Sequence, residues 1–265
     1  MKIFVWILLF LLVINVIAAL ITVFRKPRSI SSVLAWMMTL IFLPGIGFII
    51  YLFCGRGIDG QEVFKLSDDE KQMVQRIKEK VDVDNKKAGR DKRYDLLYDA
   101  KVLNRYFRNI DASPLAKRNS LQLFTDGQEK FQALFEDIRA AKETVHVEYY
   151  AFFNDTIGNQ FLDVLIEKLH EGVEVYLIYD PWGSPGANKK FFARYVDAGG
   201  KVAPFITSRD MIRKTRLNYH LHRKIVVIDG KIGWTGGFNV GDQYLNVTEK
   251  FGYWRDTHIR LVGTA

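Results

Sequence analysis

The chain has 265 residues but only one cysteine, Cys54, and not one carboxylate in residues 1–53. A single cysteine cannot form an internal disulfide. Without a Cys-x-x-Cys pair, the sequence also lacks the usual ligand spacing of a structural zinc site. With 48% hydrophobic and 26% charged residues, the composition excludes the collagen-like, disordered and disulfide-scaffold classes. The chain is therefore built around packed apolar segments.

Charge is unevenly distributed along the chain. The basic side chains of residues 1–53 are Lys2, Arg25, Lys26 and Arg28. Removing these four from the 38 Lys and Arg leaves 34, against 30 Asp and Glu, so the rest of the chain has a net charge of about +4. That part is long enough to bury a core, and its weak charge argues against nucleic acid as a partner.

Two long apolar runs open the chain. Residues 3–24 have only Asn15 and Thr22 as polar interruptions, and residues 32–53 contain no charge. As continuous helices, each would extend roughly 33 Å and cross a hydrocarbon core of about 30 Å. Basic residues follow the first run where a signal peptide would have a cleavage site. We therefore expect residues 1–55 to form a membrane hairpin of two transmembrane helices, 3–24 and 32–53, in a multi-pass cell-membrane protein. The balance of basic residues leaves its orientation open.

Residues 56–115 are predicted to form a helical linker. Ser67-Asp68-Asp69-Glu70 has the pattern of a capping box and predicts a helix to about Lys80. The polar stretch 84–93 predicts a loop, and helical spacing returns in residues 94–109.

From residue 116 onward the pattern changes to alternating strands and helices. Helical spacing occupies residues 128–141, 156–170 and 187–198. Strands are predicted at 144–153, 173–179, 202–206, 224–228, 232–235 and 257–262. Asp229-Gly230 lies between two of these strands and predicts a two-residue hairpin turn. Such alternation favours an α/β fold with a mixed sheet for residues 116–265.

One motif carries the chemistry. The segment from His222 to Asp229 fits H-x-K-x(4)-D, with Lys224 as its second member, and Gly236-Gly237-Phe238-Asn239 follows at close range. On an extended segment, residues i and i+2 face the same way, so His222 and Lys224 project together. The alternative interpretation, a hairpin that carries an ordinary surface histidine and lysine, does not account for the glycines and the asparagine.

These residue types suit the transfer of a phosphoryl group. Imidazole can attack phosphorus to give a phosphohistidine, which makes His222 the candidate nucleophile. The Lys224 ammonium can hold a phosphate oxygen as charge develops on it. Asn239 can donate a further hydrogen bond, and Gly236 and Gly237 allow the backbone to approach the phosphate. None of these steps requires a metal ion or a cofactor.

Two carboxylates complete the candidate set from the residues alone. Asp229 completes the motif, but it begins the hairpin turn, so we expect it to fix local structure rather than touch substrate. Glu148, on the predicted strand 144–153, could line the pocket, or it could be a satisfied core carboxylate.

The motif is that of the phospholipase D superfamily, and its surroundings resemble bacterial cardiolipin synthases. The segment from Asn218 to Lys224 is similar to the family's N-Y-R-N-H-R-K, from which His220 and Leu221 depart. The other segments that carry the resemblance are Gly236 to Tyr244, Trp254 to His258, and Leu43-Pro44-Gly45-Ile46-Gly47 with Tyr51 and Gly55.

The resemblance implies a fold of two αβ repeats, each of which brings one H-x-K motif to a shared pocket. One histidine is then the nucleophile, and the other protonates the leaving alkoxide. An acidic residue orients the nucleophile, and by position this is Asp256, although an ion pair of Asp256 with Arg255 is an equal alternative. Because this sequence has one motif, we expect residues 116–265 to be the first phospholipase D-like domain, with its motif region at 217–244. We expect either a chain truncated at its C-terminal end or a homodimer that pools two motifs.

The resemblance also implies an activity. The expected reaction is a phosphatidyl transfer that condenses two molecules of phosphatidylglycerol into cardiolipin and glycerol, with the catalytic domain on the cytoplasmic side. Two alternatives remain open at this point: a phospholipase D-type hydrolase in which water resolves the phosphohistidine, and an inactive half-enzyme. The expected partners are anionic phospholipid, the membrane and a second motif-bearing half.

Overall fold

The computed structural model describes residues 29–43, 45–55, 67–87, 102–107, 116, 119–206, 220–247 and 249–263, with the isolated positions 6, 10, 13, 17 and 21. These residues belong to two compact units, one N-terminal and helical and the other dominated by an αβ sandwich. The run 3–24 and the motif residues Asn218 and Tyr219 lie almost wholly outside the described residues.

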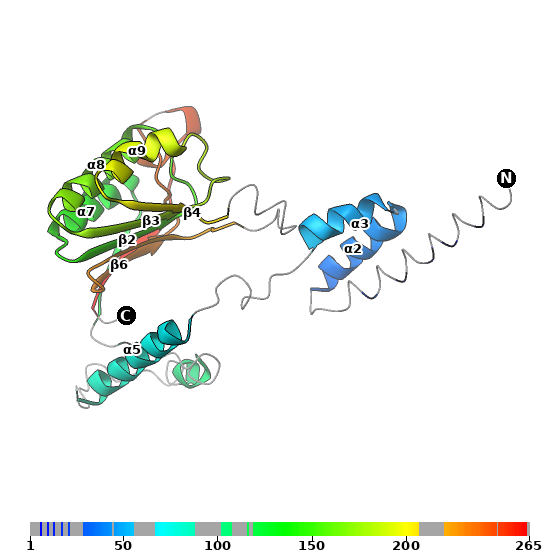
Figure 1. Ribbon diagram of the computed structural model, residues 1–265, viewed down its shortest axis with the longest axis horizontal. Helices are drawn as coiled ribbons and strands as arrows, with labels where there is room; N and C mark the ends of the chain where they lie inside the picture. Colours follow the sequence, from blue (N-terminus) through cyan, green and yellow to red (C-terminus); the bar gives the residue numbers. More distant parts are fainter. Residues whose placement is uncertain are drawn as a thin grey trace. The chain divides into compact units, whose positions relative to one another are not determined.

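The second apolar run is not one helix. It forms α2 (Ile30–Phe42), α3 (Ile46–Ile50) and a π-helical turn, η1 (Tyr51–Gly55). The chain folds back between α2 and α3, so that the Trp36 and Tyr51 rings meet edge to face with centroids 5.1 Å apart. The two helices lie side by side (Figure 1). The prediction of a continuous helix over residues 32–53 is therefore wrong.

Three residues explain the reversal. Pro44 disfavours helical backbone at Leu43, whose φ and ψ are −123° and 64°. Gly45 has a φ of 82°, which favours glycine. A Cβ on Gly47 would lie 2.6 Å from the carbonyl oxygen of Thr39, so only glycine permits this contact between the helices. Within the described residues, no helix has both the length and the apolar character that a membrane crossing requires.

Helix α5 (Asp68–Lys87) begins at the predicted capping box. The Ser67 backbone N–H donates to the Glu70 carboxylate at 2.7 Å, and the Glu70 N–H donates to the Ser67 hydroxyl at 3.3 Å. The helix continues through residues 84–87, where a loop was predicted. Those residues are polar but include no helix breaker, and the next glycine after them is Gly89.

A mixed seven-stranded sheet forms the αβ unit, in the order β1-β7-β6-β5-β2-β3-β4. Its strands are β1 (Ser120–Phe124), β2 (Thr144–Tyr149), β3 (Glu174–Tyr179), β4 (Lys201–Pro204), β5 (Lys224–Ile228), β6 (Ile232–Gly236) and β7 (His258–Val262). β2, β3 and β4 pair in parallel, and the other pairs are antiparallel. The predicted α/β class with a mixed sheet is confirmed.

Helices α7 (Gly127–Ala140), α8 (Thr156–His170) and α9 (Lys189–Asp197) cover one face of the sheet (Figure 1). Alternate strand residues point into this layer and are buried with the helices' apolar faces. On the opposite face, Leu121, Leu123 and Ile178 are 60%, 58% and 42% exposed. The core therefore lies on one side of the sheet, and the other side presents apolar side chains.

The predicted helices and strands agree with this arrangement except at two places. β1 was not predicted, because its residues are partly polar and its pairing with β7 is distant in sequence. The strand predicted over residues 144–153 ends at Tyr149. Beyond Tyr149, the chain leaves the sheet, and Phe152 forms an isolated parallel β-bridge with Val240 in the segment after β6.

Two short 3-10 helices, η3 (Asp242–Leu245) and η4 (Glu249–Phe251), follow β6. Asp242 accepts hydrogen bonds from the first two backbone N–H groups of α8, and its own N–H donates to Asp155. The segment after β6 is thereby fixed to the end of the sheet where β2 stops and β5 begins.

Candidate active site

His222 and Lys224 lie at the start of β5. The β2–β5 pairing continues just before the strand, because the Tyr150 N–H donates to the Arg223 carbonyl at 2.9 Å. The His222 Nε2 and the Lys224 Nζ are 3.3 Å apart. The predicted projection of these two side chains to the same place is confirmed. With the ammonium as donor, Nε2 presents a lone pair, which is the form that a nucleophile needs.

Lys224 is buried, and His222 is exposed. Burial lowers the pKa of Lys224, and the nearby charge of Asp256 partly offsets this effect. A cation in such surroundings is poorly hydrated, so it gains more than a surface lysine from an anionic ligand. A phosphate oxygen could take the place of Nε2 as the acceptor from Lys224.

Behind Lys224 is a group of buried polar side chains that the sequence did not single out. The Lys130 Nζ donates to the Tyr149 hydroxyl at 2.9 Å, and burial lowers the pKa of Lys130 well below its usual value. His258 is fully buried, and neither of its ring nitrogens has a hydrogen-bond partner among the described residues. Burial, with Lys130 and Lys224 nearby, lowers the pKa of His258 to about 2. The floor of the site therefore holds a neutral imidazole.

Tyr150 forms one wall of the site. Its ring centroid lies 4.7 Å from that of His222 and 6.3 Å from that of His220, and the Lys224 Nζ lies 5.3 Å from it. A Cβ on Gly183 would lie 2.8 Å from this ring, so glycine makes room for the tyrosine. The Tyr150 ring thus contacts both imidazoles.

The loop after β3 supports this wall. Asp180 is 2% exposed, and its carboxylate accepts from the N–H groups of Trp182 at 2.8 Å and Leu221 at 2.7 Å. The Ser184 hydroxyl accepts from the Phe152 N–H and donates to the Tyr150 carbonyl. Sequence reasoning missed Tyr150, Asp180 and Ser184. The available signal was Asp-x-x-Gly-Ser directly after a strand, which is a loop composition where binding residues are common.

Asn239 is close to the site but already has partners. Its Oδ1 accepts from the Ala151 N–H at 3.1 Å, and its Nδ2 donates to the Tyr244 hydroxyl at 2.8 Å. One amide hydrogen is left for a phosphate oxygen. These contacts show that Asn239 also joins the segment after β6 to the end of β2.

The two glycines make room for protein atoms. A Cβ on Gly236 would lie 2.4 Å from the Thr257 carbonyl oxygen, and one on Gly237 would lie 1.9 Å from the Asp256 carboxylate. Glycine is therefore required at both positions because the segment leading into β7 packs against them. Asp256 accepts from the Thr257 N–H and acts electrostatically on Lys224. Within the described part of the chain, it makes no hydrogen bond with His222 and no ion pair with Arg255.

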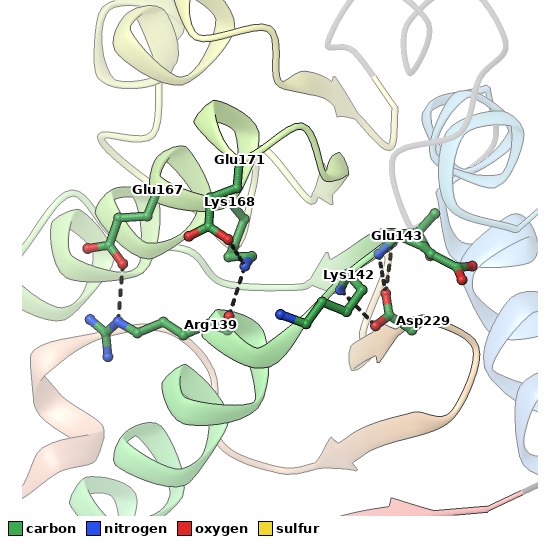
Figure 2. A network of polar contacts seen from close by, with 8 residues as sticks. Arg139, Lys142, Glu143, Glu167, Lys168, Glu171 and Asp229 are labelled. Atoms are coloured by element: carbon green, nitrogen blue, oxygen red, sulfur yellow. Dashed lines mark hydrogen bonds and ion pairs between the residues drawn. The ribbon is translucent and has the colours of Figure 1, made fainter.

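Asp229 lies at the other end of β5, about 16 Å from Lys224 by the rise of the strand. It has a φ of 51°, and its carboxylate accepts the N–H groups of Lys142, Glu143 and Thr144 at 2.8–2.9 Å (Figure 2). Burial raises its pKa, but these three bonds outweigh that effect, so the pKa of Asp229 is below its ordinary value. Asp229 therefore fixes the start of β2 and lies away from His222.

Glu148 is also directed away from the site. Tyr149 is paired with Lys224 across β2 and β5, so strand alternation turns Glu148 to the opposite face. The Glu148 Oε1 lies 3.9 Å from the Arg223 Nη1. Burial raises the pKa of Glu148, and the charge of Arg223 opposes this effect. Glu148 therefore does not line the pocket, and because it lies on the face opposite the core, it is not a core carboxylate either.

Comparison with known families agrees with this geometry. A profile described as the phospholipase D-like domain of cardiolipin synthase matches residues 134–251. A second profile, described as the N-terminal region of phospholipase D-nucleases, matches residues 13–56. The first match includes the motif and the Asp180 loop, and the second includes α2 and α3.

Curated relatives match nearly the whole chain. Cardiolipin synthase of Listeria monocytogenes serotype 4b (strain CLIP80459) is 41% identical over 98% of this chain and 54% of its own length. The major cardiolipin synthase of Bacillus subtilis (strain 168) is 40% identical over 96% and 52%, respectively. A cardiolipin synthase of Staphylococcus aureus (strain Mu50) is 40% identical over 96% and 51%. The chain thus spans about half the length of the curated relatives it matches.

Proposed function

Since the chain belongs to the phospholipase D-like cardiolipin synthase family, we propose that it carries the nucleophilic half of a phosphatidyltransferase that makes cardiolipin and glycerol from two phosphatidylglycerols. The observation that carries this proposal is the 3.3 Å contact between an exposed imidazole and a buried ammonium at one end of the sheet.

In the first step, the His222 Nε2 attacks phosphorus, the bond to the glycerol oxygen breaks, and a phosphatidyl-histidine forms. Lys224 moves its hydrogen bond from Nε2 to a nonbridging oxygen and stabilises the charge that develops there. The remaining N–H of Asn239 completes the phosphate-binding wall, and Gly236 and Gly237 give room to the Asp256–Thr257 segment beside it. The negative charge of Asp256 acts on the Lys224 ammonium rather than on the substrate.

In the second step, the hydroxyl of another phosphatidylglycerol attacks the phosphohistidine and releases His222. A second motif-bearing half, from a longer chain or from a second copy, completes the pocket.

Residues 1–55 form the membrane anchor in this proposal. No charge occurs between Ser29 and Gly55, and Ile30, Phe42 and Ile46 are 80%, 72% and 62% exposed. Such side chains suit a hydrocarbon environment. Residues 3–24 are the proposed span, and the α2–α3 hairpin replaces the second crossing that the sequence predicted. The catalytic domain faces the cytoplasm.

Two measurements test the anchor. The chain is expected to stay with membranes through salt and alkaline washes, whereas removal of residues 1–55 releases it. Cys54 is the single cysteine and is exposed, so an impermeant maleimide reports its side of the membrane. Labelling of Cys54 in intact cells would contradict the cytoplasmic placement.

Lipid analysis tests the reaction. The whole chain in mixed micelles with phosphatidylglycerol, alone or with a motif-bearing second half, is expected to produce cardiolipin and glycerol. Lys224→Met should reduce the rate by about 10²–10³-fold, because a buried cation at developing phosphate charge is lost. Lys231→Met, on the exposed hairpin, is the matched control and should not change the rate. Equal rates for the two variants would contradict the role of Lys224.

Hydrolysis is the second candidate, because His222 is exposed and water can reach a phosphohistidine there. The ratio of cardiolipin to phosphatidic acid among the products decides between the two reactions. Phosphatidic acid as the sole product would establish the hydrolase.

A further inference from the structure

The loops at one end of the sheet expose a group of large apolar side chains. This is the end where β1, β2, β3, β4 and β6 stop and where β5 and β7 begin. Its described loops lie within residues 125–126, 150–155, 180–188, 205–206, 220–223 and 237–257. The exposed apolar side chains among them are Trp182 at 58%, Val247 at 57%, Phe251 at 49% and Tyr253 at 73%. Such a group marks a surface that binds something less polar than water.

The exposed charge at this end is mostly of one sign. Its described loops and first helical turns expose one carboxylate, Glu129, against five cations: Lys189, Lys190, Arg223, Lys250 and Arg255. At the opposite end of the sheet, the loops 141–143, 171–173, 198–200 and 229–231 expose charges of both signs and no large apolar side chain. Apolar and cationic side chains therefore gather at the end that holds the candidate active site.

The loop 246–254, which carries three of these apolar side chains, is fixed at its base. The Trp254 N–H donates to the Asn246 Oδ1 at 2.6 Å, and the Asn246 Nδ2 donates to the Trp254 carbonyl at 3.2 Å. The Trp254 ring packs edge to face against Tyr244, with centroids 4.9 Å apart, and the Tyr244 hydroxyl accepts from Asn239. The base of the loop is thus joined to the phosphate-binding wall, and its apolar side chains lie between the two hydrogen-bonded residues.

Trp182 and the loop 246–254 flank the motif. The loop leads into β7 and Trp182 follows β3, and β5, which begins with the motif, lies between β7 and β3 in the sheet. The Trp182 N–H donates to the buried Asp180, and the Trp182 ring packs edge-on against His220, with centroids 5.8 Å apart. The exposed apolar side chains therefore occur on both sides of the exposed His222.

This combination of side chains matches the headgroup layer of an anionic bilayer. Tryptophan and tyrosine favour the boundary between membrane and water, and lysine and arginine are attracted to anionic lipid. Lysine is depleted in protein–protein interfaces, and three of the five exposed cations here are lysines, which favours lipid over a second protein surface.

We propose that this end of the αβ unit docks on the surface of an anionic membrane, with Trp182 and the loop 246–254 in the headgroup layer. His222 then meets the phosphodiester of a lipid that stays in the bilayer. This inference rests on the proposed function for the choice of lipid as ligand, and it adds a second membrane contact to the anchor in residues 1–55.

Quenching by lipid tests the docking without requiring turnover. The whole chain with Cys54→Ser and Val247→Cys is labelled with the fluorophore nitrobenzoxadiazole and reconstituted in vesicles of phosphatidylcholine and phosphatidylglycerol in equal amounts. Interfacial apolar groups enter the bilayer by about 5–10 Å, so acyl chains brominated near the headgroup should reduce the emission by about half or more. Lys231→Cys in the same background, on the hairpin at the opposite end of the sheet, is the matched control and should not be quenched.

Removal of one cation measures the contribution of charge. Lys250→Gln, added to the labelled Val247→Cys chain, should lower the ratio of docked to undocked protein about fivefold in vesicles that contain phosphatidylglycerol. The same change should have no effect in vesicles of phosphatidylcholine alone. Lys231→Gln, which removes a cation from the opposite end, is the control and should leave the ratio unchanged in both.

Two results would overturn the proposal. Equal emission in brominated and unbrominated vesicles would show that residue 247 stays outside the bilayer. A blue-shifted emission that bromine does not quench would show that a protein surface, such as a second motif-bearing half, covers the loop. Products are measured in the same vesicles with a second half supplied. Quenching without any cardiolipin or phosphatidic acid would remove the proposed function and leave the membrane contact in place.

Discussion

The two ends of β5 carry the two halves of one motif, and the two ends differ in the exposure and the hydrogen bonding of their side chains. At the first end, His222 is exposed, Lys224 is buried, and their polar atoms face each other with no carboxylate hydrogen-bonded to His222 in the described residues. At the second end, Asp229 is saturated by three backbone N–H groups. A motif that is continuous in sequence thus has a reactive end and an anchoring end, about 16 Å apart.

The largest expected effect separates the ends by chemistry. His222→Ala removes the nucleophile, so burst release of 4-nitrophenolate from phosphatidyl-4-nitrophenol should fall by about 10⁴-fold or more. The free energy of unfolding should change little, because His222 is exposed. A variant at the other end, Asp229→Ala, should keep the burst within about tenfold at a temperature where it is folded. A full burst in His222→Ala would remove the nucleophile assignment.

The next effect separates the ends by stability. Asp229→Ala deprives three backbone N–H groups of their acceptor and places alanine at a φ of 51°, so unfolding should become easier by about 2 kcal/mol. Asp229→Asn keeps an acceptor and tolerates that backbone, so its loss should be smaller. Denaturant unfolding of both variants measures the difference. Wild-type stability in Asp229→Ala would mean that the three hydrogen bonds contribute nothing net.

The sequence was sufficient for the elements whose signal is local. The hairpin at Asp229-Gly230, the helix 156–170 and the adjacency of His222 and Lys224 follow from turn chemistry and from the two periodicities of helix and strand. β1 was missed because it forms by pairing with β7, which is more than 130 residues away.

The side chains of the site that the sequence did not single out were missed for the same reason. Asp180, Tyr150 and His220 come from three separate segments, and only the tertiary fold brings them together. The helix predicted over residues 32–53 is the opposite kind of error, because a feature was predicted that does not form. Hydropathy alone indicated one helix, whereas Pro44, Gly45 and Gly47 permit the chain to reverse. A sliding average over apolar residues does not weigh the backbone preferences of three residues.

The third effect, of similar size, depends on pH and again distinguishes the ends. His258 lies behind Lys224, and its pKa falls from 6.5 to about 2 on folding. The unfolded chain therefore binds a proton that the folded chain refuses, and stability is full above pH 6.5 and declines as the pH falls toward 2. Between pH 7 and pH 5 the expected loss is about 2 kcal/mol. Asp229, whose pKa is lowered from 3.8, adds its own loss only below about pH 4.

His258→Phe tests this assignment. Phenylalanine cannot be protonated, and its ring suits the contacts that His258 makes with Trp234 and Phe238, at centroid distances of 6.3 and 6.2 Å. The variant should therefore unfold with nearly the same free energy at pH 7 and pH 5, whereas Asp229→Asn should keep the wild-type slope over that range. Because replacing an unsatisfied buried polar group removes its desolvation penalty, His258→Phe should lose no stability at pH 7. An unchanged slope between pH 7 and pH 5 in His258→Phe would show that the acid sensitivity arises elsewhere than behind the reactive end of β5.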